Sequence, residues 1–104
     1  MFVLMQGDAY KVPVTLLSPD NTALTPEDLA DVEITIGSLT RTYSDGGVVY
    51  ENGEWLVPLT QMETFKLPVA RIKAQVRVKW PDGRVEGQQL GHISIDESSS
   101  KGVL

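Results

Sequence analysis

The chain has 104 residues, of which 41% are hydrophobic and 22% are charged, as in an ordinary single folded domain. Its formal net charge of −5 at pH 7 disfavours general binding to nucleic acid or to anionic membranes, because both are polyanions. The sequence contains no cysteine, which excludes disulfide bonds and thiol catalysis.

The first predicted strand is the apolar segment Phe2–Met5, which Gly7 and Asp8 interrupt. It is too short for a cleaved signal peptide, and no segment has the ~20 apolar residues of a membrane span. The segment has no charge, no proline and no alternation, so both of its faces require apolar cover. We therefore expect it to contact another chain, if its own core does not bury it, through Phe2, Val3, Leu4 and Met5.

A second strand is predicted at Val12–Leu16, where apolar residues alternate with others. Pro13 lacks the N–H that a ladder needs, so this strand should lie at a sheet edge or carry a bulge. The stretch Ser18–Asn21 has the composition of a turn. Thr25 and Pro26 then predict the start of one short helical turn.

Two hairpins are predicted next. Gly37 and Ser38 form a two-residue loop that suits a type II′ turn, and Asn52 with Gly53 is the strongest hairpin signal, because both residues tolerate a positive φ. The four strands are predicted at Val32–Ile36, Leu39–Tyr43, Val48–Glu51 and Glu54–Val57.

The clearest strand is Arg71–Trp80, in which even positions are apolar and odd positions are polar. Side chains alternate across a strand, so one face is predicted to enter the core and the other to meet water. Trp80 and Trp55 are both expected in the core. Just before this strand, Thr60 and Glu63 form a capping-box pattern that predicts one helical turn.

The last strand is predicted around Ile93 and Ile95. Val85 and Leu90 lie in opposite phases, which predicts a bulge near Gly87. The serine-rich residues 98–104 are expected to form a flexible tail outside a single domain of residues 1–97.

These elements predict an all-β domain of about seven or eight strands with one or two short helical turns. A two-sheet β-sandwich is the leading architecture, and a small barrel is the alternative.

The possible catalytic groups do not form a convincing site. His92, Ser94 and Asp96 share one strand face, but side chains two residues apart lie about 6.6 Å from each other, too far for nucleophilic catalysis. His92 is the only histidine, which excludes a zinc site with several His or Cys ligands. We expect no catalytic residue, no metal and no cofactor.

Two acidic groups allow other interpretations. Glu51 and Glu54 face each other across the Asn52–Gly53 turn, which favours a solvated tip and leaves a contact with a cation or a basic partner open. Asp20 and Asp28 lack the ligand spacing of a calcium loop.

A basic stripe of four residues runs along the polar face of the long strand. It can pair with acids on neighbouring strands, such as Glu33 or Glu86, or dock onto an acidic protein face, whereas nucleic-acid binding would require interleaved aromatic residues. The stripe consists of Arg71, Lys73, Arg77 and Lys79.

Several segments together resemble the small immunoglobulin-like proteins of prophage tail regions, and the second half also resembles the N-terminal domain of phage baseplate upper proteins. The similar segments are Gln6–Asp8, Asp20–Asn21, Thr25–Pro26, Val32–Gly37, Trp55–Gln61, Lys73–Val78 and Asp82–Gly83. The resemblance implies an immunoglobulin-like β-sandwich without catalytic residues. It also implies a structural role in a virion or in the bacterial host cytoplasm.

The sequence is therefore interpreted as a non-enzymatic structural or protein-interaction module, a phage virion or tail accessory protein. Its expected partners are other phage structural proteins or further copies of itself, with no nucleic acid and no membrane. The alternative is a carbohydrate- or cell-surface-binding module of similar fold, for which exposed Tyr10, Tyr43 and Tyr50 would supply the aromatic contacts.

Overall fold

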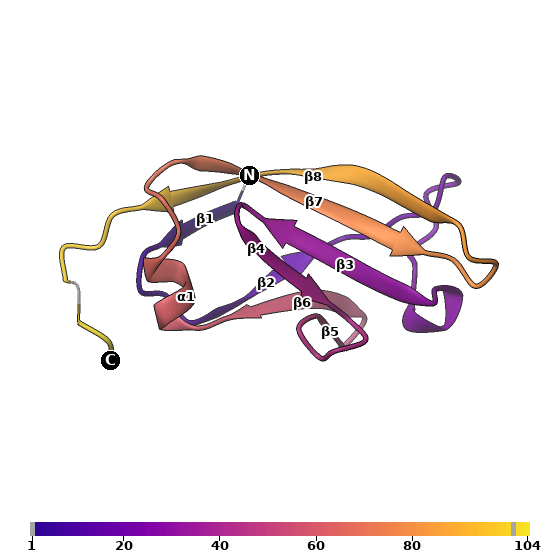
Figure 1. Ribbon diagram of the computed structural model, residues 1–104, viewed down its shortest axis with the longest axis horizontal. Coiled ribbons are helices and arrows are strands. Elements are labelled where there is room, and N and C mark those ends of the chain that lie inside the picture. Colours follow the sequence, from indigo (N-terminus) through magenta and orange to yellow (C-terminus); the bar gives the residue numbers. More distant parts are fainter. Residues whose placement is uncertain (1, 101) are drawn as a thin grey trace.

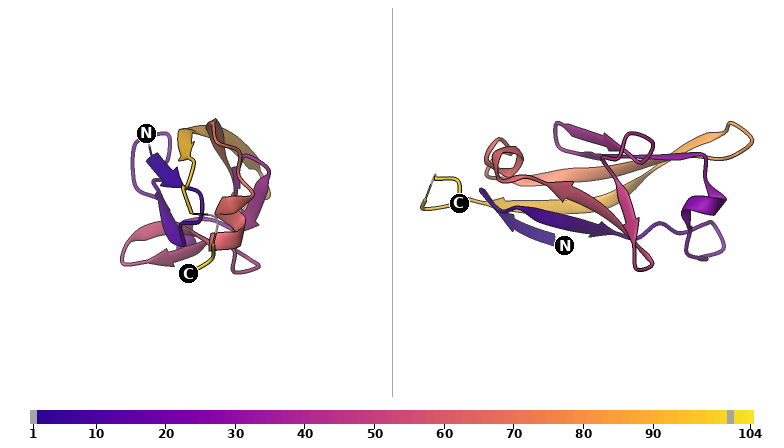
Figure 2. Two further views of the ribbon diagram at one scale, coloured as in Figure 1. Left: turned by 90° about the vertical axis from the view of Figure 1, so that its left-hand side faces the viewer. Right: turned by 90° about the horizontal axis from the view of Figure 1, so that it is seen from below.

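The long alternating strand forms the centre of the larger of two β-sheets. The computed structural model describes residues 2–100 and 102–104, and for Phe2 it describes the backbone alone. Its eight strands form a five-stranded and a three-stranded sheet that pack face to face, as the end-on view in Figure 2 shows. The all-β sandwich predicted from the sequence is confirmed.

The larger sheet has the order β1-β8-β7-β3-β4, and the smaller has the order β2-β6-β5 (Figure 1). Two short helical segments accompany them, as the sequence predicts: a 3-10 turn at Pro26–Asp28 and α1 at Gln61–Phe65. The strands are β1 Phe2–Met5, β2 Tyr10–Val14, β3 Asp31–Ile36, β4 Leu39–Thr42, β5 Val49–Glu51, β6 Glu54–Leu59, β7 Arg71–Lys79 and β8 Val85–Asp96.

Local turn chemistry sets the register of both hairpins. Ile36 pairs with Leu39 around a loop in which Gly37 has φ 58°, and Glu51 pairs with Glu54 around Asn52 (φ 51°) and Gly53 (φ 79°). A positive φ at both central residues is the type I′ geometry that matches the right-handed twist of the strands.

The core lies between the inner faces of the two sheets. Alternate residues of β7 and β3 point into it, as the period-two pattern predicts, and Trp55 of β6 is only 2% exposed. The indole Nε1 of Trp55 donates a hydrogen bond to the carbonyl of Leu24 (2.9 Å). Among the largest fully buried side chains are Leu4, Leu16, Ile34, Ile36 and Leu67.

The strand that contains Pro13 and the strand formed by the N-terminal segment both lie at sheet edges. β2 pairs only with β6 and lies at an edge of the smaller sheet, so the prediction from Pro13 is confirmed. β1 lies at an edge of the larger sheet, where Phe2–Met5 pair in parallel with Ile93–Asp96.

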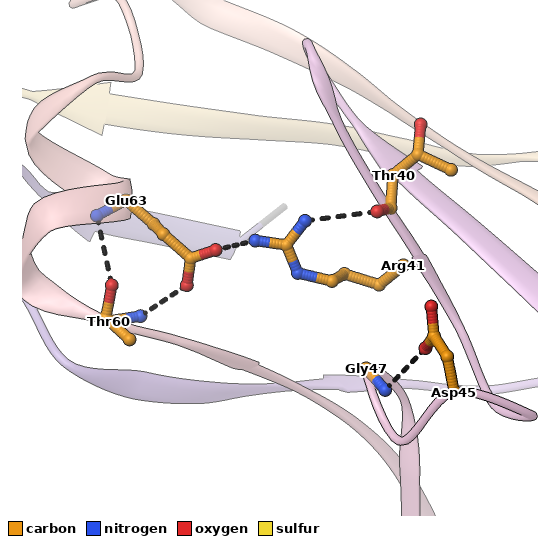
Figure 3. Close-up of polar contacts among 6 residues, drawn as sticks. All are labelled: Thr40, Arg41, Asp45, Gly47, Thr60 and Glu63. Atoms are coloured by element: carbon orange, nitrogen blue, oxygen red, sulfur yellow. Dashed lines mark hydrogen bonds and ion pairs between the residues drawn. The ribbon is translucent and has the colours of Figure 1, made fainter.

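A polar network ties α1 to the N-terminal segment and to β4. The Thr60 hydroxyl accepts from the Glu63 N–H (3.2 Å), and the Glu63 carboxylate accepts from the Thr60 N–H (2.9 Å), so the predicted capping box is confirmed (Figure 3). The same carboxylate forms an ion pair with Arg41 of β4, which ties α1 to the edge strand of the larger sheet.

Thr64, on the inner side of α1, is completely buried. Its hydroxyl accepts from the Gly7 N–H and donates to the Asp8 carbonyl, both at 2.9 Å. This one side chain therefore holds the β1–β2 turn against the helix.

Two predictions about the end of the chain are corrected. β8 is one continuous strand, and its bulge lies at Leu90 and Gly91 (φ 113°) rather than near Gly87. The prediction assumed that Val85 and Leu90 both face the core. Val85 is exposed and only Leu90 of the two packs against the core, so the side chains need not change faces at Gly87.

Trp80 is half-buried rather than a central core residue, because β7 ends at Lys79 and the indole lies in the following turn. The Arg84 guanidinium lies 5.6 Å from its ring centroid. The β7–β8 turn and α1 lie at opposite ends of a molecule that measures 47 × 22 × 22 Å (Figure 1).

Candidate interaction surface

The outer face of the larger sheet carries the polar half of the β7 pattern. Arg71, Lys73, Arg77 and Lys79 are all exposed there, as predicted. Arg77 is opposite Glu33 of β3, and their side chains form an ion pair of 2.7 Å. Among the described residues, the other three cations of the stripe have no ion pair within 4.0 Å. Cross-strand pairing therefore accounts for one member of the stripe.

The register of the sheet brings the N-terminal segment next to this stripe. Val3 of β1 and Arg71 of β7 both pair with Ser94 of β8, so they lie on one face, two strands apart. His92 and Lys73 pair in the adjacent row. Val3 is 56% exposed and Met5 is 47% exposed. Five exposed residues of this face, which we call the apolar–basic patch, are Val3, Met5, Arg71, Lys73 and His92; the exposed Asp96, opposite Met5, lies at its border.

The four residues predicted in the N-terminal segment therefore divide into different groups. Val3 and Met5 point outward, whereas Leu4 is only 2% exposed and packs in the core. Leu4 is thus a core residue and not a contact available to a partner, because the core between the sheets covers its face of β1. The side chain of Phe2 lies outside the described residues. His92 is a member of the patch that the sequence did not single out for contact.

No family model matches this chain, and no curated protein matches it.

The acidic pair at the β5–β6 turn, Glu51 and Glu54, lies beside a lysine of the same chain. Glu51 and Glu54 are directly opposite, as predicted, and the Nζ of Lys11 on β2 lies 3.0 Å from the Glu51 carboxylate. Lys11 thereby offsets the repulsion between the two carboxylates. Within residues 2–100 and 102–104, no three His, Cys, Asp or Glu side chains are grouped so that they could bind a metal ion.

The outer face also contains the residues that were considered for catalysis. His92, Ser94 and Asp96 follow one another on alternate positions of β8 and pair with different residues: Lys73, Arg71 and Met5, respectively. They therefore lie in a row along the strand, as predicted.

Among the described residues, none of the helical segments has the length and apolar character that crossing a membrane requires.

The three tyrosines do not form one aromatic surface. Tyr43 and Tyr50 each contact the ring of Trp55 edge-on, with centroids 5.3 and 4.9 Å apart, and Tyr50 is half-buried. Tyr10 is exposed on β2, where it pairs with Leu59. Two of the three rings thus serve the packing of Trp55.

Asp31 lies at the other end of the outer face, at the start of β3. Its carboxylate accepts from the Val32 N–H (2.8 Å), from the Ser44 N–H (3.0 Å) and from the Ser44 hydroxyl (2.8 Å). Burial by itself raises the pKa of Asp31, but the hydrogen bonds from Ser44 and Val32 outweigh it and hold the pKa below its ordinary value of 3.8. The charged form therefore fixes the segment after β4 against β3.

This arrangement predicts a pH dependence of stability. A carboxyl group whose pKa is lower in the folded state stabilises the fold above its unfolded pKa, and this contribution is lost as the pH falls through the folded value. We expect the free energy of unfolding to fall below about pH 4. In Asp31→Asn the fall should be shallower and the stability at pH 7 should be lower. Urea melts of both proteins from pH 7 to pH 2 measure this, and equal slopes would contradict it.

Proposed function

We propose that the protein is a non-enzymatic structural and protein-interaction module, a phage virion or tail accessory protein, that acts in the virion or in the host cytoplasm. The observation that carries the proposal is the apolar–basic patch. Its two exposed apolar side chains, Val3 and Met5, lie on an edge strand beside cations that have no ion pair in the described part of the chain. An exposed apolar cluster with a charged rim is typical of surfaces that bind other proteins.

The position of the patch supports contact with a second protein chain. β1 has only four residues, pairs with β8 on one side and has no strand on its other side, where Asp8 accepts from the Met5 N–H (3.0 Å) and donates its own N–H to the Met5 carbonyl (3.1 Å). Edge strands are usually protected by shortness, charge or proline, and Phe2–Met5 is short but contains neither charge nor proline. Apart from the Met5 groups that Asp8 occupies, the β1 edge thus offers backbone hydrogen bonds and the patch offers apolar contacts to the same partner, which is the mode of strand addition.

The phage assignment rests on the resemblance of the sequence segments to tail-region proteins, and the genes around the coding sequence test it. We expect capsid, portal or tail genes on both sides. A neighbourhood of metabolic genes in several genomes would contradict the phage assignment and would leave the interaction surface to be explained by another partner.

The contact itself is tested with Val3→Lys/Met5→Lys, which places charges on the exposed side of β1 without removing the buried Leu4. We expect the parent chain at high micromolar concentration to sediment as an oligomer and the variant to sediment as a monomer, because cations on an edge strand oppose pairing. Thr40→Lys/Thr42→Lys, on the opposite edge strand β4, is the matched control and should leave the oligomer intact.

A parent chain that remains monomeric would exclude self-association through β1. Titration with a series of soluble oligosaccharides tests the carbohydrate-binding alternative in the same samples. Binding that depends on Tyr10 and not on Val3 or Met5 would favour that alternative over protein contact.

A further inference from the structure

The first half of β8 has a second unpaired edge, away from the patch. β8 pairs with β7 from Val85 to Ser94, but β1 covers its other side only from Ile93 onward. Val85–Gln89 are all exposed, and this part of the hairpin extends toward the end of the molecule opposite α1 (Figure 1). We call this segment the free β8 edge.

The direction of the backbone groups follows from the ladder. In an antiparallel pair, hydrogen-bonded and non-hydrogen-bonded positions alternate. The Trp80 N–H donates to the Arg84 carbonyl (2.8 Å), whereas the Lys79 carbonyl accepts from Ala30 on the β3 side (2.7 Å). Lys79 and its partner Val85 are therefore a non-hydrogen-bonded pair. The same holds for the next alternate pairs, Arg77 with Gly87 and Gln75 with Gln89. The N–H and C=O groups of Val85, Gly87 and Gln89 thus point away from β7, toward the unpaired side.

On the inner side, the free β8 edge borders a hollow between the two sheets that is apolar at its base and polar at its rim, where Ser18, Glu86 and Gln88 lie. A cavity of about 120 Å³ lies here, lined by residues that include Leu16, Leu24, Val76, Val78 and Trp80. The buried Nε1 of Trp80 has no hydrogen-bond acceptor among the described residues. A second cavity of about 400 Å³, lined by Val14, Leu90 and Ile93 among others, continues along the same side between β2 and β8. The inward side chains of a strand added to β8 would enter this space.

On the outer side, the charge pattern specifies what such a strand should carry. β3 shows the pattern on the other flank of β7: Asp31 and Glu33 are opposite Lys79 and Arg77, while Val32 and Ile34 are buried. On the β8 flank the residues opposite these cations are Val85 and Gly87, and neither is acidic. A strand beyond β8 lies about 10 Å from β7. Acidic side chains can reach across that span over Gly87, which has no side chain.

We propose that the free β8 edge binds an extended segment of a partner protein in which apolar and acidic side chains alternate. The backbone of the segment pairs with Val85, Gly87 and Gln89. Its apolar side chains enter the hollow beside Leu16 and Val76. Its acidic side chains face Lys79, which has no ion pair in the described part of the chain, and Arg77, which also binds Glu33. This inference rests on the proposed role in protein contact, and it names the chemistry of one partner at a site separate from β1.

A synthetic peptide tests the proposal on the full chain. The probe is an acetylated and amidated ten-residue peptide that alternates valine and glutamate, at pH 7. Its controls are a peptide that alternates valine and lysine, and the glutamate peptide with N-methyl groups on alternate residues. We expect the glutamate peptide to bind at least tenfold more tightly than either control. At saturation it should slow hydrogen exchange of the Val85, Gly87 and Gln89 amides at least tenfold.

Two variants separate the backbone and charge parts of the proposal. Gly87→Pro removes an outward N–H at an edge position, where proline is tolerated, and should weaken binding of the glutamate peptide at least tenfold. Lys79→Glu keeps the backbone edge and should abolish the preference for glutamate over lysine. Unchanged exchange at the three amides, or equal binding of both peptides to the parent chain, would overturn the proposal.

The outcome is distinguishable from that of the proposed function. If the peptide fails to bind while Val3→Lys/Met5→Lys still dissociates the oligomer, the free β8 edge is not a binding site and the proposed contact through β1 stands. Slowed exchange confined to the β1 amides would also overturn the proposal for β8.

Discussion

Replacing Trp55 with alanine should lower the free energy of unfolding by about 3–5 kcal/mol, the range typical of removing a large aromatic side chain from a core. Trp55 is 2% exposed, it contacts the rings of Tyr43 and Tyr50, and its Nε1 binds the Leu24 carbonyl. Equilibrium urea unfolding followed by far-ultraviolet circular dichroism measures the loss.

The two tryptophans provide a matched control through Trp55→Phe and Trp80→Phe. Trp55→Phe leaves the Leu24 carbonyl without its donor and should cost about 1–3 kcal/mol. Trp80→Phe removes a buried N–H that has no acceptor among the described residues, and should change stability by less than about 1 kcal/mol. A larger loss of stability for Trp80→Phe than for Trp55→Phe would contradict the central position of Trp55 in the core.

Replacing Thr64 with valine should destabilise the protein by about 2–3 kcal/mol, although the two side chains have nearly the same shape. Valine can neither accept from the Gly7 N–H nor donate to the Asp8 carbonyl, and both groups lie at the packed junction between the β1–β2 turn and α1. Thermal and urea unfolding of the variant would measure the cost. Hydrogen exchange at the Gly7 amide should accelerate in the same variant.

Thr64→Ser is the control for this prediction, because it keeps the hydroxyl and removes only a methyl group. It should retain the Gly7 protection and lose about 1 kcal/mol or less of stability. Equal losses for Thr64→Val and Thr64→Ser would mean that packing, and not the hydrogen bonds, makes this position important.

The parts of the fold that the sequence predicted correctly are those that depend on local chemistry. The alternation in Arg71–Lys79 determines which face is buried, because side chains on a strand can point only two ways. The Asn52–Gly53 turn and the Thr60–Glu63 capping box each need only residues within four positions of one another. Such signals are independent of the rest of the fold.

The errors arose where a distant element decides the environment. Val85 and Leu90 are equally apolar, and nothing near them reveals that Val85 lies opposite Lys79 on the outer face whereas Leu90 packs against the core. The position of the bulge followed from that choice. Trp80 was placed in the core for the same reason, since the alternation continues to it although β7 ends one residue earlier.

The candidate surface was predicted in two separate pieces. The exposure of the basic stripe follows from the alternation, but its closeness to Val3 and Met5 depends on the parallel pairing of β1 with β8, which joins the two ends of the chain. The free β8 edge was missed. A signal was present, because Glu86–Gln89 contains no apolar residue on either phase, and such a run is typical of a strand without cover on either face.

The parallel pairing of the first and last strands also has a mechanical consequence. A force that pulls the flanking chain segments apart acts along β1 in one direction and along β8 in the other. All the backbone hydrogen bonds between Phe2–Met5 and Ile93–Asp96 then carry the load together in shear, whereas the bonds of a hairpin pulled open from its free end break one after another. Under tension between its termini, the fold should therefore unfold slowly. This resistance depends on the rate of unfolding and not on the equilibrium stability.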